Sequence, residues 1–582
     1  MPLSRRRRTL RRLGWSIPVL ILLAALGWLV ATGLLARQQA SAAQHDVGRV
    51  KSSMAAGDLT AAERQAADLA GHAHRAHRLT TGPAWWLAGK LPWLGRPAVA
   101  VRGCTAQLDA LSAGVLSPLV QVAGQLSGSS LVDHGSVRLP ALAAAAPVLD
   151  RAQHTLASAS DQVDALPART WLSPVDRTTR SFRSDLTTLR GQLDSIHRVS
   201  TLLPRLLGAD GKQRYFVGLE NEAESRGLGG IPGAFVIATA DHGRLAFERY
   251  ESDTALVGVR TGLDLGPEYQ QRYRGADPAN TYQNSTISPD FSDAARIWAA
   301  MWQAKSGERV DGAIAIDPTA LSYLLTVTGP AHTAGGEQIT ANTVVPLTQK
   351  TLYQRYPDTA RRKAELIDIA TGVAQRLLTA HGSPDLVRAA LKGAAQRRLL
   401  VWSADPAVEG QLRQTSFGGV LVPSYRPFAG FTTVNATGGK LDYYLHRTMS
   451  YQRTGCGSAG RSVATFTIDN DAPDRRLPSY VTLRADHPGY PTKPGDDKVL
   501  VSYYGTPGAR ITAVTVNGRP TIVAPGTEHG LTVFTLPLEL PRGASSQITV
   551  TAAEPPTTGS VQLLKQPAVQ PVTVTVREPS CG

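Results

Sequence analysis

The sequence predicts a multidomain protein with an N-terminal transmembrane helix, an α-helical stalk or bundle, an α/β core domain and a C-terminal Ig-like β-sandwich. Three observations support this fold class. An uncharged run lies near the N-terminus, helical periodicity follows it, and short alternating runs fill the last part of the chain. A length of 582 residues leaves room for about three or four domains. The predicted boundaries are 1–12, 13–36, 37–205, 206–425 and 426–582.

Residues 13–36, LGWSIPVLILLAALGWLVATGLLA, carry no charge. As a helix this run would be roughly 36 Å long, enough to cross a hydrocarbon core of roughly 30 Å. A cleaved signal peptide with an ASAA site is the alternative, but its apolar region is usually only about 7–15 residues. We therefore expect a retained transmembrane anchor and a single-pass protein of the cell membrane.

Arginines dominate residues 1–12, directly before the uncharged run. The positive-inside rule then predicts a cytoplasmic basic tail, with the bulk of the chain outside the cell. The same arginines would also suit a nucleic-acid arm, but their position against a membrane span favours the topological role. We expect no nucleic-acid partner. The formal net charge of +15 suits anionic polymers or lipid headgroups instead.

Residues 37–205 carry apolar residues at three- and four-residue steps, as in AERQAADLAGHAHRAHRL, which predicts a helical membrane-proximal region. Proline and glycine interrupt this pattern at 83–95, a segment that holds Trp85, Trp86 and Trp93. Tryptophan favours the membrane interface, so this segment could touch lipid. Its aromatic rings could equally pack on the helices, and the sequence leaves both alternatives open.

Residues 206–425 mix the two patterns, which predicts an α/β core domain. The run SPDFSDAARIWAAMW shows a helix start, with Ser288 or Asp290 as the N-cap and Pro289 in the first turn. We expect strands at 214–219, 233–239, 244–250, 311–316 and 398–402, and helices at 290–304, 318–325, 340–355, 361–380 and 384–397.

Residues 426–582 contain short alternating runs such as VATFTID and KVLVSYY, separated by proline and glycine. Asn517-Gly518 is a strong hairpin signal, and the spacing of the runs is typical of an Ig-like sandwich. Cys456 lies near the start of this region and Cys581 at its end, so we predict a disulfide between them. Cys104 is left over, and the sequence does not decide whether it is free.

The common catalytic motifs HExxH, GxSxG and GxxxxGK[ST] are absent from the sequence, which argues against a kinase or an ATPase. GCGSAG at 455–460 has the GxGxxG spacing, but it lies at the start of the region of short alternating runs. Polar residues instead gather at 220–235, ENEAESRGLGGIPGAF, between two predicted strands. One interpretation is a turn, in which Glu224 and Arg226 pair and the glycines supply positive φ angles. Those glycines are Gly227, Gly229, Gly230 and Gly233.

The other interpretation of this stretch is an anion site. Glycines let backbone N–H groups approach an anion, and Arg226 would clamp it. Asn221 and Glu224 would then orient the clamp or a metal ion. Several other polar residues follow predicted strands, where α/β domains place their ligands.

The stretch ENEAESRGLGGIPGAF resembles the signature of the membrane-anchored "domain of unknown function 4012" family of Gram-positive bacteria. SPDFSDAARIWAAMW, VDGAIAIDPTALSYLLTVTGP, ANTVVPL, RRLLVWSAD, GGKLDYYL and LPSYV follow in the family's order. The resemblance covers roughly residues 200–550. It implies an envelope location, one N-terminal anchor and a large outer domain.

A weaker, fold-level resemblance is to the LytR–CpsA–Psr phosphotransferases, which move glycopolymers from polyprenyl-pyrophosphate carriers onto peptidoglycan. By this resemblance Arg226, Arg361 and Arg362 would grip phosphate, and Asp253 or Asp290 would hold Mg²⁺. The sequence departs from that family, because its arginine-rich phosphate loops are not clearly present.

These observations predict an envelope protein that binds or scaffolds a cell-wall polymer or an assembly partner. The alternative is a phosphotransferase that moves a lipid-linked glycopolymer at the outer membrane face, with Mg²⁺ as its cofactor. Expected partners are the membrane and either a polyprenyl-phosphate lipid or an anionic cell-wall polymer. The candidate catalytic residues are Arg226, Glu224, Asn221, Asp253 and Asp290, and the candidate ligand-binding residues are Arg226, Gly229, Gly230, Arg361 and Arg362.

Overall fold

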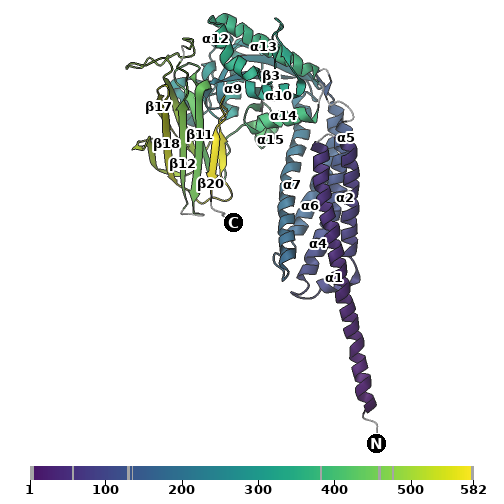
Figure 1. The fold of residues 1–582 in the computed structure, drawn as a ribbon. Coiled ribbons are helices and arrows are strands. Elements are labelled where there is room, and N and C mark those ends of the chain that lie inside the picture. The colour runs from purple at the N-terminus through teal and green to yellow at the C-terminus, as the bar shows by residue number, and fades with distance from the viewer. Residues whose placement is uncertain are drawn as a thin grey trace. The chain divides into compact units, whose positions relative to one another are not determined.

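A computed structural model describes the chain in two compact units (Figure 1). The first unit comprises Met1–Leu131 and Arg138–Pro204, and the second comprises Val132–Val137 and Arg205–Gly582. The described residues are 5–55, 58–127, 132–133, 135–380, 383–455, 460–474 and 477–578. The predicted disulfide between Cys456 and Cys581 lies outside them.

The first unit is a bundle of helices. They are α1 (Arg5–Ala55), α2 (Leu59–Leu79), α3 (Pro83–Gly89), α4 (Arg96–Leu111), the π-helical turn η1 (Ser112–Leu116), α5 (Ser117–Ser127), α6 (Leu139–Asp164) and α7 (Ser173–Leu206). The core positions of α6 recur at three- and four-residue steps, from Leu149 through Leu156 to Val163, and they form one apolar face. Asp58 caps α2 by accepting a hydrogen bond from the N–H of Ala61 at 2.9 Å.

The predicted transmembrane helix over 13–36 is corrected by the structure. Within the described part of the chain, no helix combines the length and the apolar character that a membrane span requires. The predicted run instead forms part of α1, a single helix of 51 residues. Thr32 and Ala36 are buried within the unit, so this part of the run contacts protein on one side.

A seven-stranded sheet forms the centre of the α/β part of the second unit, in the order β1-β2-β5-β4-β3-β6-β9. Its strands are β1 (Val132–Asp133), β2 (Ser136–Val137), β3 (Gln213–Arg226), β4 (Gly229–Asp241), β5 (Arg244–Ser252), β6 (Gly312–Ile316) and β9 (Leu399–Ser403), and β7 (Ala331–His332) and β8 (Gln338–Ile339) form a separate pair. β3 and β6 pair in parallel, whereas β3–β4, β4–β5 and β6–β9 are antiparallel.

Helices cover both faces of this sheet. The longer ones are α9 (Phe291–Ser306), α10 (Pro318–Thr328), α13 (Thr359–Thr379) and α14 (Pro384–Ala395). Shorter ones are η2 (Asp253–Leu256), α8 (Pro267–Tyr273), η3 (Arg274–Ala276), η4 (Tyr282–Asn284), α11 (Val344–Pro346), η5 (Leu347–Thr351), α12 (Leu352–Arg355), α15 (Pro406–Leu412) and η6 (Ser416–Gly418). Successive side chains of a strand point to opposite faces of the sheet, so the sheet has an apolar core on each face. Phe216 packs with Trp298 of α9 on one face, and Val217 packs with Leu324 of α10 on the other.

Two further sheets stack into a sandwich after residue 427. One has the order β16-β17-β13-β10-β19 and the other β15-β14-β18-β12-β11-β20. The strands are β10 (Phe428–Asn435), β11 (Leu445–Thr454), β12 (Arg461–Asn470), β13 (Asp497–Gly505), β14 (Arg510–Val516), β15 (Arg519–Pro520), β16 (Gly526–Glu528), β17 (Leu531–Leu540), β18 (Ser545–Ala553), β19 (Gln562–Lys565) and β20 (Thr573–Arg577), with the short helix η7 (Leu441–Tyr444) before β11. Phe431 of one sheet stacks on Phe466 of the other at 4.9 Å in the shared core.

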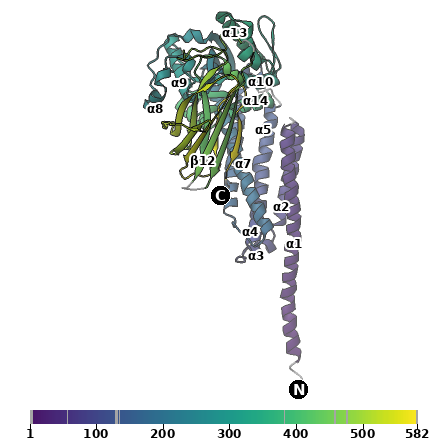
Figure 2. The ribbon, with the colours of Figure 1, turned by 60° about the vertical axis from the view of Figure 1, so that its left-hand side comes forward.

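The sandwich departs from the predicted Ig-like topology. An immunoglobulin domain has seven or nine strands in antiparallel sheets. Here the sheets have five and six strands, and β10–β19 and β11–β20 pair in parallel. The chain is therefore mixed α/β with several sheets and with many strands in its C-terminal region (Figure 2).

Candidate functional site

The polar stretch at 220–235 forms the outer end of the β3–β4 hairpin. The register shifts between Asn221 and Ser225, where β3 bulges away from β4. Glu222 and Glu224 lie in this bulge, and both side chains are buried. At the hairpin tip the N–H of Leu228 donates to the carbonyl of Thr286 at 3.0 Å. The stretch is therefore enclosed by other parts of the second unit.

The glycines of this stretch serve close packing. None of the four, as the structure describes them, has a positive φ, which differs from the turn interpretation. A Cβ added at Gly227 would lie 2.0 Å from the carbonyl oxygen of Ile287, and one at Gly230 would lie 2.3 Å from the backbone of Asn221. Gly233 has open space around it. Two of the glycines are thus required because backbone approaches backbone.

Glu224 is held by two cations. Its Oε1 accepts from Nη2 of Arg226 at 3.0 Å, and its Oε2 accepts from Nζ of Lys440 at 2.7 Å. Burial alone raises the pKa of Glu224, but the charges of Lys440 and Arg226 outweigh it and hold the pKa below its ordinary value. The ionised carboxylate thus ties the α/β part to the segment before β11.

The guanidinium of Arg226 is occupied by protein acceptors. Besides Glu224, it donates to the carbonyl oxygens of Gln283 at 3.2 Å, Ser225 at 3.0 Å and Asn435 at 3.5 Å. The side chain is only 6% exposed. An incoming phosphate would have to displace these contacts.

Glu222 and Asp317 share one arginine. Nη1 of Arg398 donates to Glu222 at 3.0 Å and to Asp317 at 2.6 Å, and its Nη2 donates to the carbonyl of Ala568 at 2.8 Å. Burial, followed by the charge of Asp317, raises the pKa of Glu222 well above its ordinary value. The second oxygen of Glu222 accepts from Nε2 of Gln349.

Among the three buried glutamates of the hairpin, Glu220 has the fewest hydrogen-bond partners. Its Oε2 accepts from the N–H of Gly230 at 3.4 Å, and its Oε1 has no hydrogen-bond partner within the described chain. Burial, helped by the charge of Asp317, raises the pKa of Glu220 to about 8. The group is therefore protonated at neutral pH.

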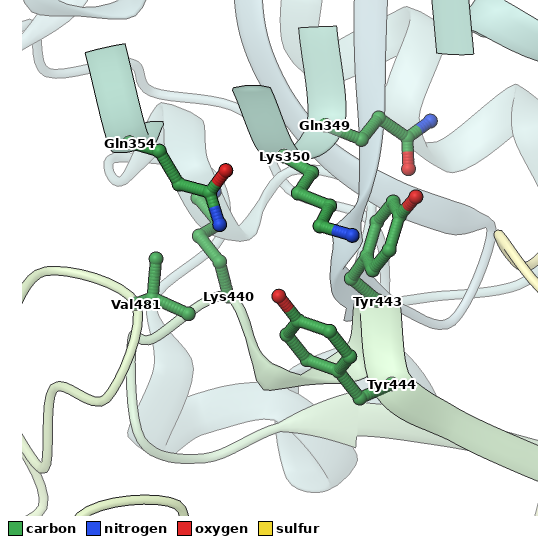
Figure 3. Close-up of a pocket in the computed structure, with 7 residues that line it drawn as sticks. All are labelled: Gln349, Lys350, Gln354, Lys440, Tyr443, Tyr444 and Val481. Atoms are coloured by element: carbon green, nitrogen blue, oxygen red, sulfur yellow. The ribbon is translucent and has the colours of Figure 1, made fainter. Parts of the chain in front are cut away.

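A surface depression lies directly beyond these carboxylates. It is lined by Gln349, Lys350, Gln354, Lys440, Tyr443, Tyr444 and Val481 (Figure 3). We call it the tyrosine–lysine pocket. The hairpin holds its inner wall, because Glu222 binds Gln349 and Glu224 binds Lys440. Gln349 and Lys350 belong to the π-helical turn η5, a conformation found frequently at functional sites.

Two side chains of the pocket have bonding capacity to spare. Gln349 is 1% exposed, and among the described residues its Oε1 has no hydrogen-bond donor. Nζ of Lys350 lies over the rings of Tyr443 at 5.2 Å and Tyr444 at 5.8 Å. The pocket thus offers an ammonium group and two aromatic rings, and the unpaired oxygen of Gln349 is buried from solvent.

The structure connects Asp253 to the hairpin through Gln283 and connects Arg362 to it through Tyr353. The hydroxyl of Tyr353 accepts from Nδ2 of Asn221 at 2.9 Å, and its ring centroid lies 5.0 Å from the guanidinium of Arg362. Asp253 accepts from Nε2 of Gln283 at 3.0 Å and pairs with Lys363, while the carbonyl of the same Gln283 accepts from Arg226. Arg362 is buried, with its guanidinium 4.4 Å from the ring centroid of Tyr480.

Arg361 follows the N-cap of α13 and is exposed to solvent. Its guanidinium lies 5.0 Å from the ring centroid of Tyr356, and its Nε is 4.0 Å from Glu365. The three arginines predicted to grip one phosphate therefore contact different partners.

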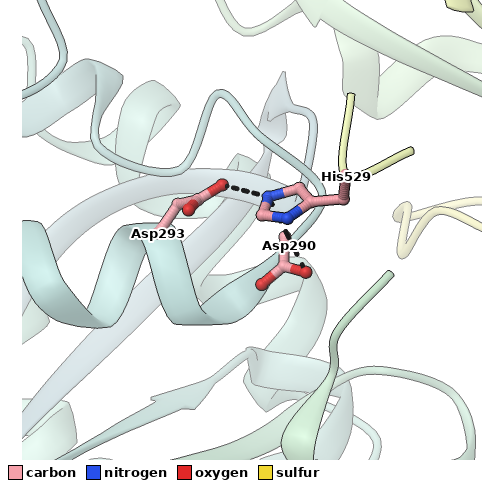
Figure 4. A group of neighbouring side chains, drawn as sticks. All are labelled: Asp290, Asp293 and His529. Atoms are coloured by element: carbon pink, nitrogen blue, oxygen red, sulfur yellow. Dashed lines mark hydrogen bonds and ion pairs between the residues drawn. The ribbon is translucent and has the colours of Figure 1, made fainter. Parts of the chain in front are cut away.

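Asp290 belongs to a second group, with Asp293 and His529 (Figure 4). Asp290 caps α9 by accepting from Ser292, and its other oxygen accepts from the N–H of Leu421 at 2.8 Å. Nε2 of His529 lies 2.9 Å from Asp293 and 3.9 Å from Asp290. Two carboxylates and one imidazole could hold a transition metal, since Mg²⁺ prefers an all-oxygen set.

Without a metal ion, the side chains of this second group form an ion pair. Burial lowers the pKa of His529, but its hydrogen bond to Asp293 and the charge of Asp290 outweigh burial and raise the pKa to about 9. At neutral pH the imidazole therefore carries a proton, which a metal would have to displace.

Sequence reasoning missed the tyrosine–lysine pocket. The residues that it omitted are Gln349, Lys350, Lys440, Tyr443 and Tyr444. A signal was present in GGKLDYYL, where a lysine and paired tyrosines follow two glycines in a segment without strand alternation. Nothing in the local sequence indicated Gln349, because its burial depends on the distant hairpin.

Comparison with known proteins covers the hairpin and one side of the pocket. The family described as "Protein of unknown function (DUF4012)" matches residues 210–353, a segment that contains the β3–β4 hairpin, Gln349 and Lys350. No curated protein and no solved structure matches the chain. The family resemblance predicted from the polar stretch is thus supported over this segment, and the resemblance to the LytR–CpsA–Psr enzymes stays a prediction. A DUF4012 domain of unknown function is present over residues 210–353, and the chain is similar to this family over that segment.

Proposed function

We propose that this protein is a non-catalytic binding protein of the cell envelope that holds an anionic polysaccharide in the tyrosine–lysine pocket. The observation that carries the proposal is the ammonium group of Lys350 above the rings of Tyr443 and Tyr444. A cation beside aromatic rings suits a ligand that offers both a negative charge and a sugar face. A phosphorylated or uronic sugar has both groups.

The contacts of Lys350 leave it available to an anion. Among the described residues no carboxylate lies within ion-pair distance of its Nζ, which rests on two tyrosine rings. A partly exposed cation–π contact contributes about 0.5–1 kcal/mol, whereas a hydrogen bond to a charged group contributes about 1.5–3 kcal/mol. An anionic ligand would therefore draw the ammonium group away from the rings and leave a ring face to stack on a sugar.

The pocket is an open depression of the surface, which suits contact with one face of a sugar in a longer chain. The polymer would continue across the surface. A chemical step on a phosphate would instead benefit from a site that excludes water.

The transferase alternative has less support from the geometry. It requires Arg226 to grip a pyrophosphate, yet Arg226 is buried and bonded to Glu224 and three carbonyl oxygens. Lys440 is likewise committed to Glu224. These groups have the surroundings expected of a structural network.

The test is binding of polygalacturonate oligomers to the full chain, measured by isothermal titration calorimetry at low salt. We expect Lys350→Gln to weaken binding by about tenfold, because one charged contact is lost. Lys392→Gln is the matched control, since Lys392 also lies over a tyrosine ring, that of Tyr323, but outside the pocket. Dextran oligomers of equal length test the need for charge.

Equal loss of affinity in the two lysine variants would remove the pocket from the proposal. Failure of the wild-type chain to bind any anionic polysaccharide would overturn the proposal itself. Preference for dextran would retain a sugar site but contradict the role of Lys350.

A further inference from the structure

A set of large apolar side chains is exposed in the first unit. They are Trp86, Leu87, Leu91, Trp93, Leu94 and Trp171, which are between 47% and 60% exposed. We call this set the tryptophan patch. The indole N–H of Trp171 donates to the carbonyl of Leu94 at 3.0 Å, which joins the two segments that form the patch. Contiguous exposed apolar surface of this kind marks an interaction site.

The exposure results from how α3 packs. Trp85 is buried against α1, where its indole N–H donates to Oγ1 of Thr32 at 2.9 Å. Because successive residues of a helix point about 100° apart, fixing Trp85 inward turns Trp86 and Leu87 away from the bundle. The patch is therefore positioned by a specific contact.

Helix α3, which carries Trp86 and Leu87, lies at the end of the bundle beyond which α1 extends, as Figure 2 shows. Near that end α1 also exposes large apolar side chains, namely Leu23, Leu26, Trp28, Val30, Leu34 and Leu35. The contact between Trp85 and Thr32 places α3 beside this stretch of α1. One apolar surface thus extends from α1 to the tryptophan patch.

The charges around this surface are mostly positive. Residues 81–103 contain Lys90, Arg96 and Arg102 and have no aspartate or glutamate. Near Trp171, Arg169 is accompanied by the acidic residue Asp176, which accepts from the N–H and Oγ1 of Thr170 at 2.8 Å. Lys90 lies over the ring of Trp86 at 5.2 Å, so its ammonium group is at the edge of the apolar surface.

We infer that the tryptophan patch docks this unit on an anionic lipid surface. Tryptophan rings prefer the headgroup region of a bilayer, where one end is apolar and the other meets water. The surrounding lysine and arginines complement anionic headgroups, each contributing about fivefold to the affinity. Docking at the interface needs no helix that crosses the bilayer.

The same surface is less suited to a second copy of the chain. Two identical patches face each other in a symmetric dimer, so Lys90, Arg96 and Arg169 would meet their own counterparts. Like charges brought together at an interface oppose association. A lipid surface provides the opposite charge.

The test is hydrogen–deuterium exchange of the full chain with phosphatidylglycerol vesicles, with phosphatidylcholine vesicles and without vesicles. We expect phosphatidylglycerol to slow exchange in peptides that cover 83–95 and 167–173, and phosphatidylcholine to do so much less. Slowed exchange that rises with protein concentration when vesicles are absent would point to a second copy and overturn the lipid proposal. Unchanged exchange in both segments with either lipid would also overturn it.

Two variants separate the apolar and the charged contributions. Trp86→Glu/Leu91→Glu should abolish the protection, while Lys90→Gln/Arg96→Gln should lower the partition into phosphatidylglycerol vesicles by about 30-fold at low salt. Tyr425→Glu/Ile522→Glu is the control, because both residues are highly exposed and lie in the second unit. Circular dichroism melting confirms that each variant folds. Equal binding by all three variants would contradict the role of the patch.

Discussion

Nζ of Lys440 lies 2.7 Å from Oε2 of Glu224, although 216 residues separate the two in sequence. Both side chains are buried, and the pKa of Glu224 is held below its ordinary value by this contact and by Arg226. The pair joins the β3–β4 hairpin to the segment that carries Tyr443 and Tyr444. Its integrity therefore determines both the stability of the second unit and the shape of the tyrosine–lysine pocket.

We predict that Lys440→Met lowers the free energy of unfolding by about 3–5 kcal/mol, because it leaves a buried carboxylate with one cation. Urea denaturation measures the change. Lys212→Met, which breaks the exposed pair with Glu248, should cost no more than about 1 kcal/mol. Addition of Glu224→Gln to Lys440→Met should restore part of the loss, and a strictly additive double variant would contradict the ion-pair explanation.

Gly227→Ala should destabilise the protein by about 3 kcal/mol or more, because the new Cβ would lie 2.0 Å from the backbone oxygen of Ile287. Gly233→Ala is the matched control in the same hairpin, since nothing lies within 4 Å of its Cβ position. Thermal melting of the two variants checks this. Similar melting temperatures would mean that the hairpin tip shifts to admit the methyl group.

Because the pKa of Glu220 is raised in the folded protein, we predict that the free energy of unfolding depends on pH. Its pKa of about 8 in the folded state exceeds the ordinary value of 4.5, so between these values the folded state binds more protons than the unfolded state. Stability contributed by this proton is therefore complete below about pH 4.5 and is lost as the pH rises through 8, by at most about 4–5 kcal/mol.

Glu220→Gln should flatten this part of the profile, which urea midpoints between pH 5 and 9 can measure. A residual slope of the same sign is expected, because burial and the charge of Asp442 raise the pKa of Asp497 to about 8 as well. A variant whose profile matches the wild type would show that Glu220 ionises normally.

Cys104 should react slowly in the folded protein. Its thiol is half-buried with Sγ 3.8 Å from Oγ1 of Thr179, and the structure gives it as a free cysteine. Burial raises the pKa of Cys104, so less of the reactive thiolate is present. We expect alkylation by iodoacetamide, followed at the Cys104 peptide by mass spectrometry, to be at least about tenfold slower in the native protein than in urea. Equal rates would indicate that the bundle opens readily around α4.

Local patterns predicted many helices and strands because the spacing of apolar residues within an element shows which face of that element is buried. The helix predicted over 290–304 is confirmed as α9, with Asp290 as its N-cap. The alternation in VATFTID is confirmed in β12, where every second residue is buried. The buried face of an element and its capping side chain are determined by residues that are close in sequence, so both can be predicted from the sequence.

The helix predicted over 340–355 shows where such patterns stop being informative. The structure divides this segment into α11, the π-helical turn η5 and α12. Periodicity does not reveal a π-helical turn, because the turn adds a single residue to one helical repeat. Here the turn coincides with the contact between Gln349 and Glu222, which is 127 residues distant in sequence.

The sequence by itself showed that 220–235 is polar and rich in glycine, and that this stretch resembles one family. The predicted connection between two strands is wrong, because β3 and β4 include all of this stretch except residues 227–228. Only the tertiary structure decided what its charges do. Glu222 and Glu224 find their partners in Arg398 and Lys440, and Arg226 finds backbone carbonyls at Gln283 and Asn435. The reason is physical: a buried charge is stabilised by whichever opposite charge the fold brings within about 3 Å, and that distance depends on long-range packing that no local pattern encodes.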